Sequence, residues 1–372
     1  MKQQYAITSQ IFLVLFAVLA ILSPILNSNL WATIALLPFV MRSVLLKNFK
    51  QQSIYIFFIL SLTIILQALG EAFGNINYTL RLLITILALI HLTEKEKKIF
   101  LSVSFYTIGI LFAQLLTTTT AVSDVDLLAG ERVLQWDIWG GQIQANVVGL
   151  YAAIGLILAS LIRLNLIIKI AMSALFITVL FKSGSRSALL FLAAYYIPIA
   201  ISNKKYFALF LMAAFSALVF VLFSAYDFGK FSDNRLLSTS DSGRLLFYYQ
   251  SLELFVRNSY LPVDDFILES RRIILDSLYL SSLIRFGPIL TLAIVLIIIR
   301  ALTKYDPNNP GNRLLLAVAI LGIPESAVLG NTLLLAFTVI MYTATSKPRS
   351  LTPKTKNPSN FVVTRITKEH SS

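Results

Sequence analysis

Residues 7–26 read ITSQIFLVLFAVLAILSPIL, a run of twenty residues without a charged side chain. The hydrocarbon core of a bilayer is about 30 Å thick, and a helix of roughly 20 apolar residues crosses it. The run is longer than the apolar core of a signal peptide, and no clear small-residue cleavage site accompanies it. We therefore expect a membrane-spanning helix that remains in the mature protein.

Similar runs recur along the whole chain, separated by short polar breaks. Hydrophobic residues make up 57% of the 372 residues and charged residues only 13%, too little polar surface for a soluble domain of this size. The predicted spans are 7–26, 30–46, 54–70, 78–92, 99–118, 145–162, 166–181, 187–202, 206–225, 279–302, 314–329 and 331–346. The last two could instead form one long tilted helix or a re-entrant pair. The predicted fold is all-α, a polytopic membrane protein with about 12 transmembrane helices (roughly 10–12).

The composition also argues against metal and disulfide chemistry. The chain has no cysteine and two histidines, His91 and His370. A disulfide framework or a thiolate-ligated metal needs cysteine, and a histidine-rich metal site needs clustered histidines. No glycine loop that would cradle a phosphate and no carboxylate pair for a divalent metal is evident. We expect neither a metal nor a cofactor.

The basic residues predict the orientation of the chain. With the N-terminus inside, the predicted inner loops and the C-terminal tail contain most of the 31 lysines and arginines. Basic residues in short loops mark the cytoplasmic side, so the net charge of +13 reflects topology and not nucleic-acid binding. We predict one transmembrane domain over 1–346, with both termini in the cytoplasm, and a disordered basic tail over 347–372.

Two predicted outer segments are long, roughly 117–145 and 226–280. Long loops in compact folds are usually functional or disordered. Within the second, apolar residues recur at helical spacing between Ser242 and Pro262. These residues are Leu245, Tyr248, Tyr249, Leu252, Phe255 and Val256. They predict an amphipathic helix, which either lies on the membrane surface or covers a cavity.

The outer side also contains arginines that membrane orientation does not require. Arg81 lies within a predicted span, and Arg186 follows a Ser-Gly-Ser segment at the outer junction of two spans. Others in or beside the large loop are Arg235, Arg244, Arg257, Arg271, Arg272 and Arg285. Guanidinium groups bind phosphate through two parallel hydrogen bonds, and helix N-termini attract anions. The cluster predicts a site for a phosphorylated lipid headgroup. Alternatively, the side chains of Arg81 and Arg186 extend to the membrane–water interface without binding a ligand, or they pair with Glu71 or Glu325.

Four short motifs follow one another in the second half of the chain. They are Asn146 with Val147-Val148-Gly149, then Ser183-Gly184-Ser185-Arg186-Ser187, then Asp241-Ser242-Gly243-Arg244, and finally Asp276-Ser277-Leu278-Tyr279-Leu280 with Arg285-Phe286-Gly287. Together they resemble the bacterial O-antigen ligase and polymerase superfamily, over roughly residues 140–300. The resemblance implies an integral-membrane glycosyltransferase of the bacterial cytoplasmic (inner) membrane. Ligases of that superfamily typically carry a histidine where this chain has Asp276-Ser277, so the resemblance favours a repeat-unit polymerase.

The resemblance also implies roles for individual residues. In a polymerase, the growing glycan leaves undecaprenyl pyrophosphate and joins the terminal sugar of another lipid-linked repeat unit. Arg186 and Arg244 are the first candidates to neutralise the leaving pyrophosphate. Asp276 is the first candidate for the general base that accepts the acceptor's hydroxyl proton, ahead of Glu269, Asp264 and Asp265. Further substrate-binding candidates are Arg81, Lys182, Arg235, Ser185, Asn146 and Glu269.

The expected partners are an undecaprenyl-pyrophosphate-linked oligosaccharide and membrane lipids, with a chain-length regulator and a flippase as further candidates and no nucleic acid. The product could be O-antigen, capsular polysaccharide or exopolysaccharide. The first alternative is an O-antigen ligase that transfers lipid-linked glycan to an acceptor such as lipid A-core. The second is a polysaccharide transporter or flippase. Transporters commonly contain related halves, whereas this sequence has no evident internal repeat and gathers its arginines beside one large loop.

Overall fold

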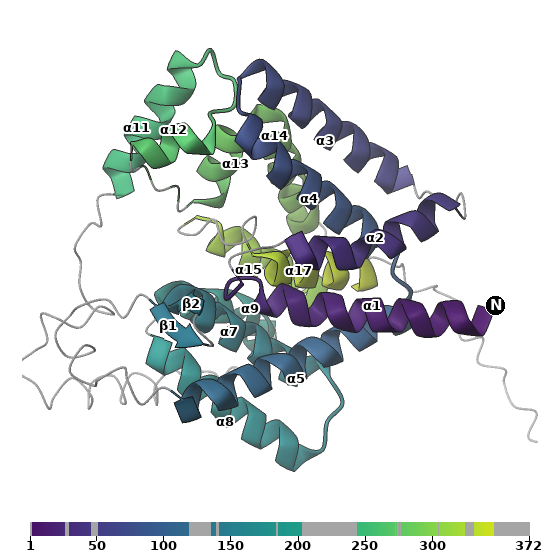
Figure 1. The fold of residues 1–372 in the computed structure, drawn as a ribbon. Helices are drawn as coiled ribbons and strands as arrows, with labels where there is room; N and C mark the ends of the chain where they lie inside the picture. The colour runs from purple at the N-terminus through teal and green to yellow at the C-terminus, as the bar shows by residue number, and fades with distance from the viewer. Residues whose placement is uncertain are drawn as a thin grey trace, which may run out of the picture.

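The structure, a computed structural model, is a bundle of helices with one small β-hairpin (Figure 1). It describes residues 2–26, 30–45, 51–118, 135–138, 141–183, 185–202, 244–271, 273, 275, 277–303, 305–323 and 331–345. In this view the N-terminus lies at the right, and the hairpin, α11 and α12 lie at the left. The left is the side that the sequence predicts to be outside the membrane.

The helices of the first half of the chain each overlap one predicted span, and three of them begin five residues before it. They are α1 (Lys2–Leu22), α2 (Leu30–Leu45), α3 (Gln51–Leu69), α4 (Phe73–Ile90), α5 (Glu94–Thr118), α7 (Ala145–Leu161), α8 (Leu166–Ser183) and α9 (Arg186–Ser202). The predicted span 206–225 lies outside the described residues. The later helices are α11 (Arg244–Arg257), α12 (Asp265–Ser270), α13 (Leu278–Phe286), α14 (Pro288–Thr303), α15 (Pro310–Leu321) and α17 (Thr332–Thr345).

An antiparallel hairpin departs from the all-α prediction. Strand β1 (Gln135–Ile138) pairs with β2 (Gly141–Gln144), with Gln135 opposite Gln144. Both strands alternate polar and apolar residues, the period of a strand with two different faces. The hairpin lies in the long segment predicted to be outside and leads directly into α7, so it belongs to the connection between spans and not to the bundle.

The described helices are those of a membrane protein. Three of them are long and apolar enough to cross a bilayer, judged by length and composition: Phe73–Ile90, Glu94–Leu116 and Leu166–Ser183. Eight further apolar helices in the described part of the chain are shorter, 10–17 residues each. The fold is therefore predominantly α-helical and suited to a membrane, and the total of about 12 spans stays a prediction.

The predicted span 279–302 is wrong as a single helix. It is broken into α13 and α14 between Phe286 and Pro288. Gly287 has a φ of 86°, a conformation that favours glycine. Pro288 has no backbone N–H and begins α14, a position that proline tolerates well. The nine residues of α13, about 13 Å long at 1.5 Å per residue, are too short to cross a bilayer.

Close packing around α7 builds the main core. Tyr151, on α7, is fully buried, and Gly155 one turn later lets Phe176 of α8 approach the α7 backbone. Phe176 also packs edge-on against Phe105 and Phe112 of α5, with ring centroids 5.5 and 5.9 Å apart. These aromatic contacts join α5, α7 and α8 into one unit. Helix α9 packs against α7 of this unit, and α15 packs in turn against α9.

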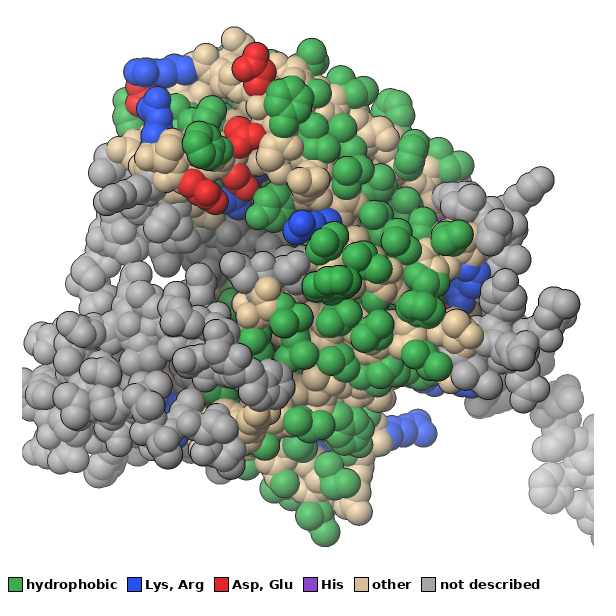
Figure 2. All heavy atoms as spheres, viewed as in Figure 1, with side chains coloured by type: hydrophobic (Ala, Val, Ile, Leu, Met, Phe, Trp, Pro, Cys, Tyr) green, Lys and Arg blue, Asp and Glu red, His purple; other side chains and the backbone are tan. Residues whose placement is uncertain are grey.

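Apolar side chains also cover the outside of the bundle. Phe57 and Phe58 on α3 and Ile167 and Ile170 on α8 are exposed, with 65% of Phe58 accessible. Figure 2 shows hydrophobic side chains over much of the face formed by α3 and α4. An exposed apolar surface of this extent is suited to contact with lipid chains.

Arg42, in the last turn of α2, has a structural role. Its guanidinium donates two hydrogen bonds to Glu96, at 2.6 and 3.1 Å, and one to the carbonyl of His91 at 3.1 Å. Glu96 in turn accepts a hydrogen bond from the backbone N–H of Thr93, and Thr93 Oγ1 accepts one from the N–H of Glu96. This reciprocal cap fixes the start of α5 and ties it to α2.

Candidate functional site

Ser185 forms the N-terminal cap of α9. Its hydroxyl accepts a hydrogen bond from the backbone N–H of Ala188 at 3.3 Å and lies 3.2 Å from the hydroxyl of Ser187. Ser183, the last residue of α8, is buried, and its hydroxyl donates to the carbonyl of Leu180 at 2.7 Å. Small hydroxyl side chains thus fix the end of one helix and the start of the next. Arg186 becomes the first residue of α9 and is exposed.

Gly149 of α7 packs directly on these serines. A Cβ atom at this position would lie 2.5 Å from Cβ of Ser185 and 2.6 Å from Oγ of Ser183. Both distances are shorter than normal non-bonded contacts, so only glycine allows this approach. The motif that begins at Asn146 and the motif that contains Arg186 are therefore side by side, although 40 residues separate them in the sequence.

The start of α13 joins the same end of the bundle. The backbone N–H of Leu278 donates to the carbonyl of Gly322 at 2.8 Å, and Oγ of Ser277 donates to the same oxygen at 3.3 Å. Gly322 caps the C-terminus of α15, which packs against α9. Leu278 is buried in the core cluster that also contains Ala188 of α9. Two of the four motifs are thus in direct contact, and the start of the fourth is joined to α15, which packs against α9. We call this end of the bundle, which the sequence predicts to be outside the membrane, the outer end.

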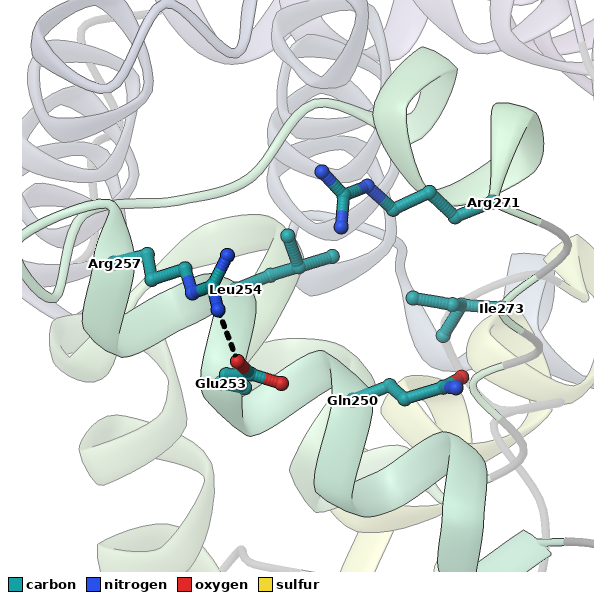
Figure 3. Close-up of a pocket in the computed structure, with 6 residues that line it drawn as sticks. All are labelled: Gln250, Glu253, Leu254, Arg257, Arg271 and Ile273. Atoms are coloured by element: carbon teal, nitrogen blue, oxygen red, sulfur yellow. Dashed lines mark hydrogen bonds and ion pairs between the residues drawn. The ribbon is translucent and has the colours of Figure 1, made fainter.

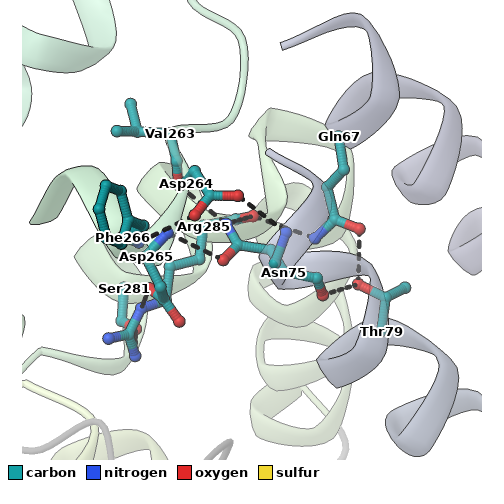
Figure 4. Close-up of polar contacts among 10 residues, drawn as sticks. Gln67, Asn75, Thr79, Val263, Asp264, Asp265, Phe266, Ser281 and Arg285 are labelled. Atoms are coloured by element: carbon teal, nitrogen blue, oxygen red, sulfur yellow. Dashed lines mark hydrogen bonds and ion pairs between the residues drawn. The ribbon is translucent and has the colours of Figure 1, made fainter. Parts of the chain in front are cut away.

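A network of polar side chains ties the large loop to α3 and α4 (Figure 4). The side-chain amide of Asn75 donates to the carbonyls of Val263 and Arg285, at 2.8 and 3.0 Å. Gln67 donates to the same Arg285 carbonyl at 3.1 Å and accepts a hydrogen bond from Thr79 at 2.9 Å. Asn75 and Gln67 are fully buried. Buried amides with satisfied hydrogen bonds specify one arrangement of the helices they join.

Two further side chains complete this attachment. Asp264 accepts hydrogen bonds from the backbone N–H groups of Gly74 and Phe266, both at 2.8 Å, and so caps α12 while binding the start of α4. Asn258 donates to the carbonyl of Pro262 at 2.8 Å and to that of Gly70 at 3.4 Å. Asp264 is thus occupied in holding the loop in place, which disfavours it as a general base.

Asp265 and Arg285 form an ion pair beside the network. Oδ1 of Asp265 lies 2.6 Å from Nε of Arg285, although neither atom makes a hydrogen bond of ordinary geometry. Burial raises the pKa of the Asp265 carboxyl above its ordinary value, and the neighbouring guanidinium opposes that rise. Arg285 also donates to Oγ of Ser281 at 3.3 Å. The pair connects α12 to α13, so this outer arginine has a carboxylate partner and is not available to an anionic substrate.

A cavity of about 340 Å³ opens between α11 and the segment that follows α12 (Figure 3). Its lining residues are Gln250, Glu253, Leu254, Arg257, Arg271 and Ile273. Arg257 donates to Glu253 at 2.5 Å, whereas the guanidinium of Arg271 makes no hydrogen bond or ion pair with any described residue. The guanidinium groups of Arg257 and Arg271, the carboxylate of Glu253 and the amide of Gln250 line the cavity together with the apolar side chains of Leu254 and Ile273. Such a lining is able to bind hydroxyl groups and one anionic group.

The predicted site residues fall into three groups. Six are described with their side chains: Arg81, Asn146, Lys182, Ser185, Arg186 and Glu269. Arg244 is described as the first residue of α11, without its side chain, and this start agrees with the predicted helix of the large loop. Asp276 and Arg235 lie outside the described residues, as does Glu325.

The structure brings together some of the six and not others. Ser185 packs against Gly149 of α7, one turn after the half-buried Asn146. Arg186 follows Ser185 at the start of α9, and Lys182 is exposed at the end of α8. Arg81, on α4, lies with its guanidinium 5.8 Å from the ring centre of Tyr78, and no ion pair joins it to the described Glu71. Glu269, on α12, is exposed, and its carboxylate makes no hydrogen bond or ion pair with a described residue.

The polar attachment of the large loop was not predicted in full. The sequence alone indicates no role for Gln67, Asn75, Thr79 or Asn258 in this attachment. Asn75, which directly follows Gly74, carries little signal, because its partners are backbone carbonyls far away in sequence. The Glu253 and Arg257 pair follows the i, i+4 spacing of helix ion pairs and could have been found.

Comparisons with protein-family models, with curated proteins and with solved structures find no match to this chain. Within the described residues, no group of three or more His, Asp or Glu side chains could hold a metal ion.

Proposed function

We propose that this protein is a glycosyltransferase that polymerises undecaprenyl-pyrophosphate-linked oligosaccharide repeat units on the outer side of the bacterial cytoplasmic membrane. Its product would be O-antigen, capsular polysaccharide or exopolysaccharide. The proposal places the N-terminus and the basic tail in the cytoplasm, in keeping with the distribution of lysine and arginine. A flippase would supply the substrate, and a chain-length regulator would act beside it.

The single observation that carries the proposal is the direct contact between the Asn146 motif and the Arg186 motif at the outer end. Gly149 packs on Ser183 and Ser185, while Ser277 and Leu278 bind the carbonyl of Gly322. Each of these motifs lies at or beside the start of a helix, where the helix dipole favours an anion. Arg186 adds a cationic side chain at the start of α9. The arrangement suits a diphosphate.

In the proposed reaction, the acceptor hydroxyl oxygen bonds to the anomeric carbon of the donor glycan. The bond from that carbon to the pyrophosphate oxygen breaks, and undecaprenyl pyrophosphate leaves with the electron pair. Arg186, together with Arg244, would neutralise the negative charge that grows on the leaving group. Lys182, exposed near Arg186, Arg81 and Arg235 would support binding of the pyrophosphate.

A carboxylate would accept the proton of the acceptor hydroxyl. Asp276 stays the first candidate, because its neighbour Ser277 is fixed at the outer end by Gly322. Glu269 is the second candidate, since its carboxylate is exposed and has no described partner. Asp264 and Asp265 are less suited, because the first caps α12 and the second pairs with Arg285. No metal or cofactor is part of the proposed reaction.

The surface glycans of a strain that lacks this gene test the proposal. A polymerase predicts a surviving single repeat unit and no ladder of longer chains. Long lipid-linked glycan that never reaches its final acceptor would instead identify a ligase. Lipid-linked repeat units that stay on the cytoplasmic side would identify a flippase. Either of the last two results would contradict the proposal.

A further inference from the structure

Helix α11 has three distinct faces. Phe255 and the fully buried Ser251 face the protein, where Phe255 packs with Ile284 of α13. A polar face carries Glu253 and Arg257, which line the cavity described above. The third face is apolar and exposed. A helix with a buried side needs no second apolar face for its own folding, so this face calls for a separate explanation.

The exposed apolar face consists of large side chains at helical spacing. Tyr249, Leu252 and Val256 are three and four residues apart, so they lie in one row along α11. The exposed fractions of Tyr249 and Val256 are 68% and 52%. Two further aromatic residues of the loop are exposed, Tyr260 just after α11 and Phe266 on α12, with 77% of Phe266 accessible. We call these five residues the loop's apolar face.

The polar network fixes the position of this face relative to α3 and α4. Asn258, two residues before Tyr260, binds the carbonyl of Gly70, and Asp264, two residues before Phe266, binds the N–H of Gly74. Gly70 and Gly74 flank the turn between α3 and α4. The exposed apolar residues Leu69 and Phe73 lie at the same turn. The loop's apolar face therefore begins where the lipid-facing surface of α3 and α4 ends.

We propose that the loop's apolar face lies in the interfacial layer of the outer leaflet, so that α11 and α12 rest on lipid. Continuity with the apolar surface of α3 and α4 favours lipid over a protein partner. The composition agrees, because tyrosine and phenylalanine are suited to the level of the headgroups, with charged side chains directed to water. Figure 2 shows hydrophobic side chains among charged ones over this part of the molecule.

This contact answers a question that the amphipathic pattern left open. Helix α11 rests on the membrane with its exposed apolar face and covers part of the protein with its buried face. It would also hold the cavity of Arg257 and Arg271 just above the membrane surface, within reach of the headgroup of a lipid-linked substrate.

Spin labels on single cysteines test the proposal, because the chain contains no cysteine of its own. Val256→Cys and Phe266→Cys would carry labels on the apolar face, with Glu253→Cys and Glu269→Cys as matched controls on the same helices. Phe58→Cys, at an exposed position on α3, would give the accessibility ratio expected for a label in contact with lipid. The protein is reconstituted in vesicles of phosphatidylethanolamine and phosphatidylglycerol, and relaxation by oxygen is compared with relaxation by a water-soluble nickel chelate.

The expected ratio of oxygen to nickel accessibility is several-fold higher at positions 256 and 266 than at 253 and 269, and approaches that at position 58. Equal ratios at all four loop positions would contradict the proposal, because the face would then be in water. Labels at 256 and 266 that neither reagent reaches would also contradict it and would indicate a second copy or another protein on this face. Neither outcome depends on glycan synthesis.

Discussion

Replacing Arg186 with alanine is expected to abolish polymer formation while leaving the protein in the membrane at its normal level. Arg186 is exposed at the first turn of α9, so the helix cap at Ser185 and the packing behind it stay intact. Removing one group that stabilises transition-state charge typically lowers a rate by about 10²–10³-fold. The measurement is the length distribution of the surface glycan, with the amount of membrane protein quantified in parallel.

Two matched variants separate charge from position. Arg186→Lys keeps the charge but loses the planar fork, so we expect partial activity with shorter polymer. Arg163→Ala removes an exposed arginine at the other end of α7 and should leave the polymer unchanged. Polymer of wild-type length from Arg186→Ala would remove Arg186 from the pyrophosphate site.

Gly149→Ala is expected to lose most polymerising activity, although it adds only one methyl group. That methyl group would lie 2.5 Å from Cβ of Ser185, so either α7 or the Ser185 cap must move. Overpacking of this kind costs about 1–3 kcal/mol of stability. Moving the cap would also displace Arg186, so activity should fall by more than the amount of folded protein does.

Gly155→Ala is the matched control on the same helix. Its methyl group would lie 2.8 Å from Cε2 of Phe176, in the core and away from the outer end. We expect a similar loss of stability but near-normal activity for each molecule that folds. Equal activity per folded molecule in the two variants would show that the contact of Gly149 with the serines has no part in catalysis.

Helix existence was predictable from this sequence, whereas several helix boundaries were not. Hydropathy located α2, α3 and α7 well, because uninterrupted apolar runs leave no alternative in a membrane. Helices α5 and α15 begin before their apolar runs do. Their starts depend on polar caps, Thr93 with Glu96 and Asn309 with the N–H groups of Gly311 and Asn312. A count of apolar residues does not detect such polar caps.

The break between α13 and α14 could have been read from the sequence. Gly287-Pro288 is a dipeptide that commonly interrupts helices, but the apolar residues on both sides conceal it in a hydropathy average. The β-hairpin is a similar case, since Gln135-Trp136-Asp137-Ile138 alternates in polarity over only four residues. Short alternating runs are weak signals in a chain so rich in apolar residues.

In the candidate site, too, some features could be predicted from the sequence and others could not. The start of α9 at Arg186 and of α11 at Arg244 agrees with the small-residue segments before them. The attachment of the large loop depends instead on Asn75, whose carbonyl partner in Val263 is 188 residues away. An amide in an apolar helix predicts that some hydrogen bond will form, but only the folded chain determines its partner.

Reconstitution of the purified protein in vesicles with one lipid-linked repeat unit tests the central claim most directly. The account predicts a ladder of lipid-linked glycans, with one undecaprenyl pyrophosphate released for each repeat unit added, and without added metal or nucleotide. A lipid-linked repeat unit that is left unchanged, or only moved across the bilayer, would contradict it.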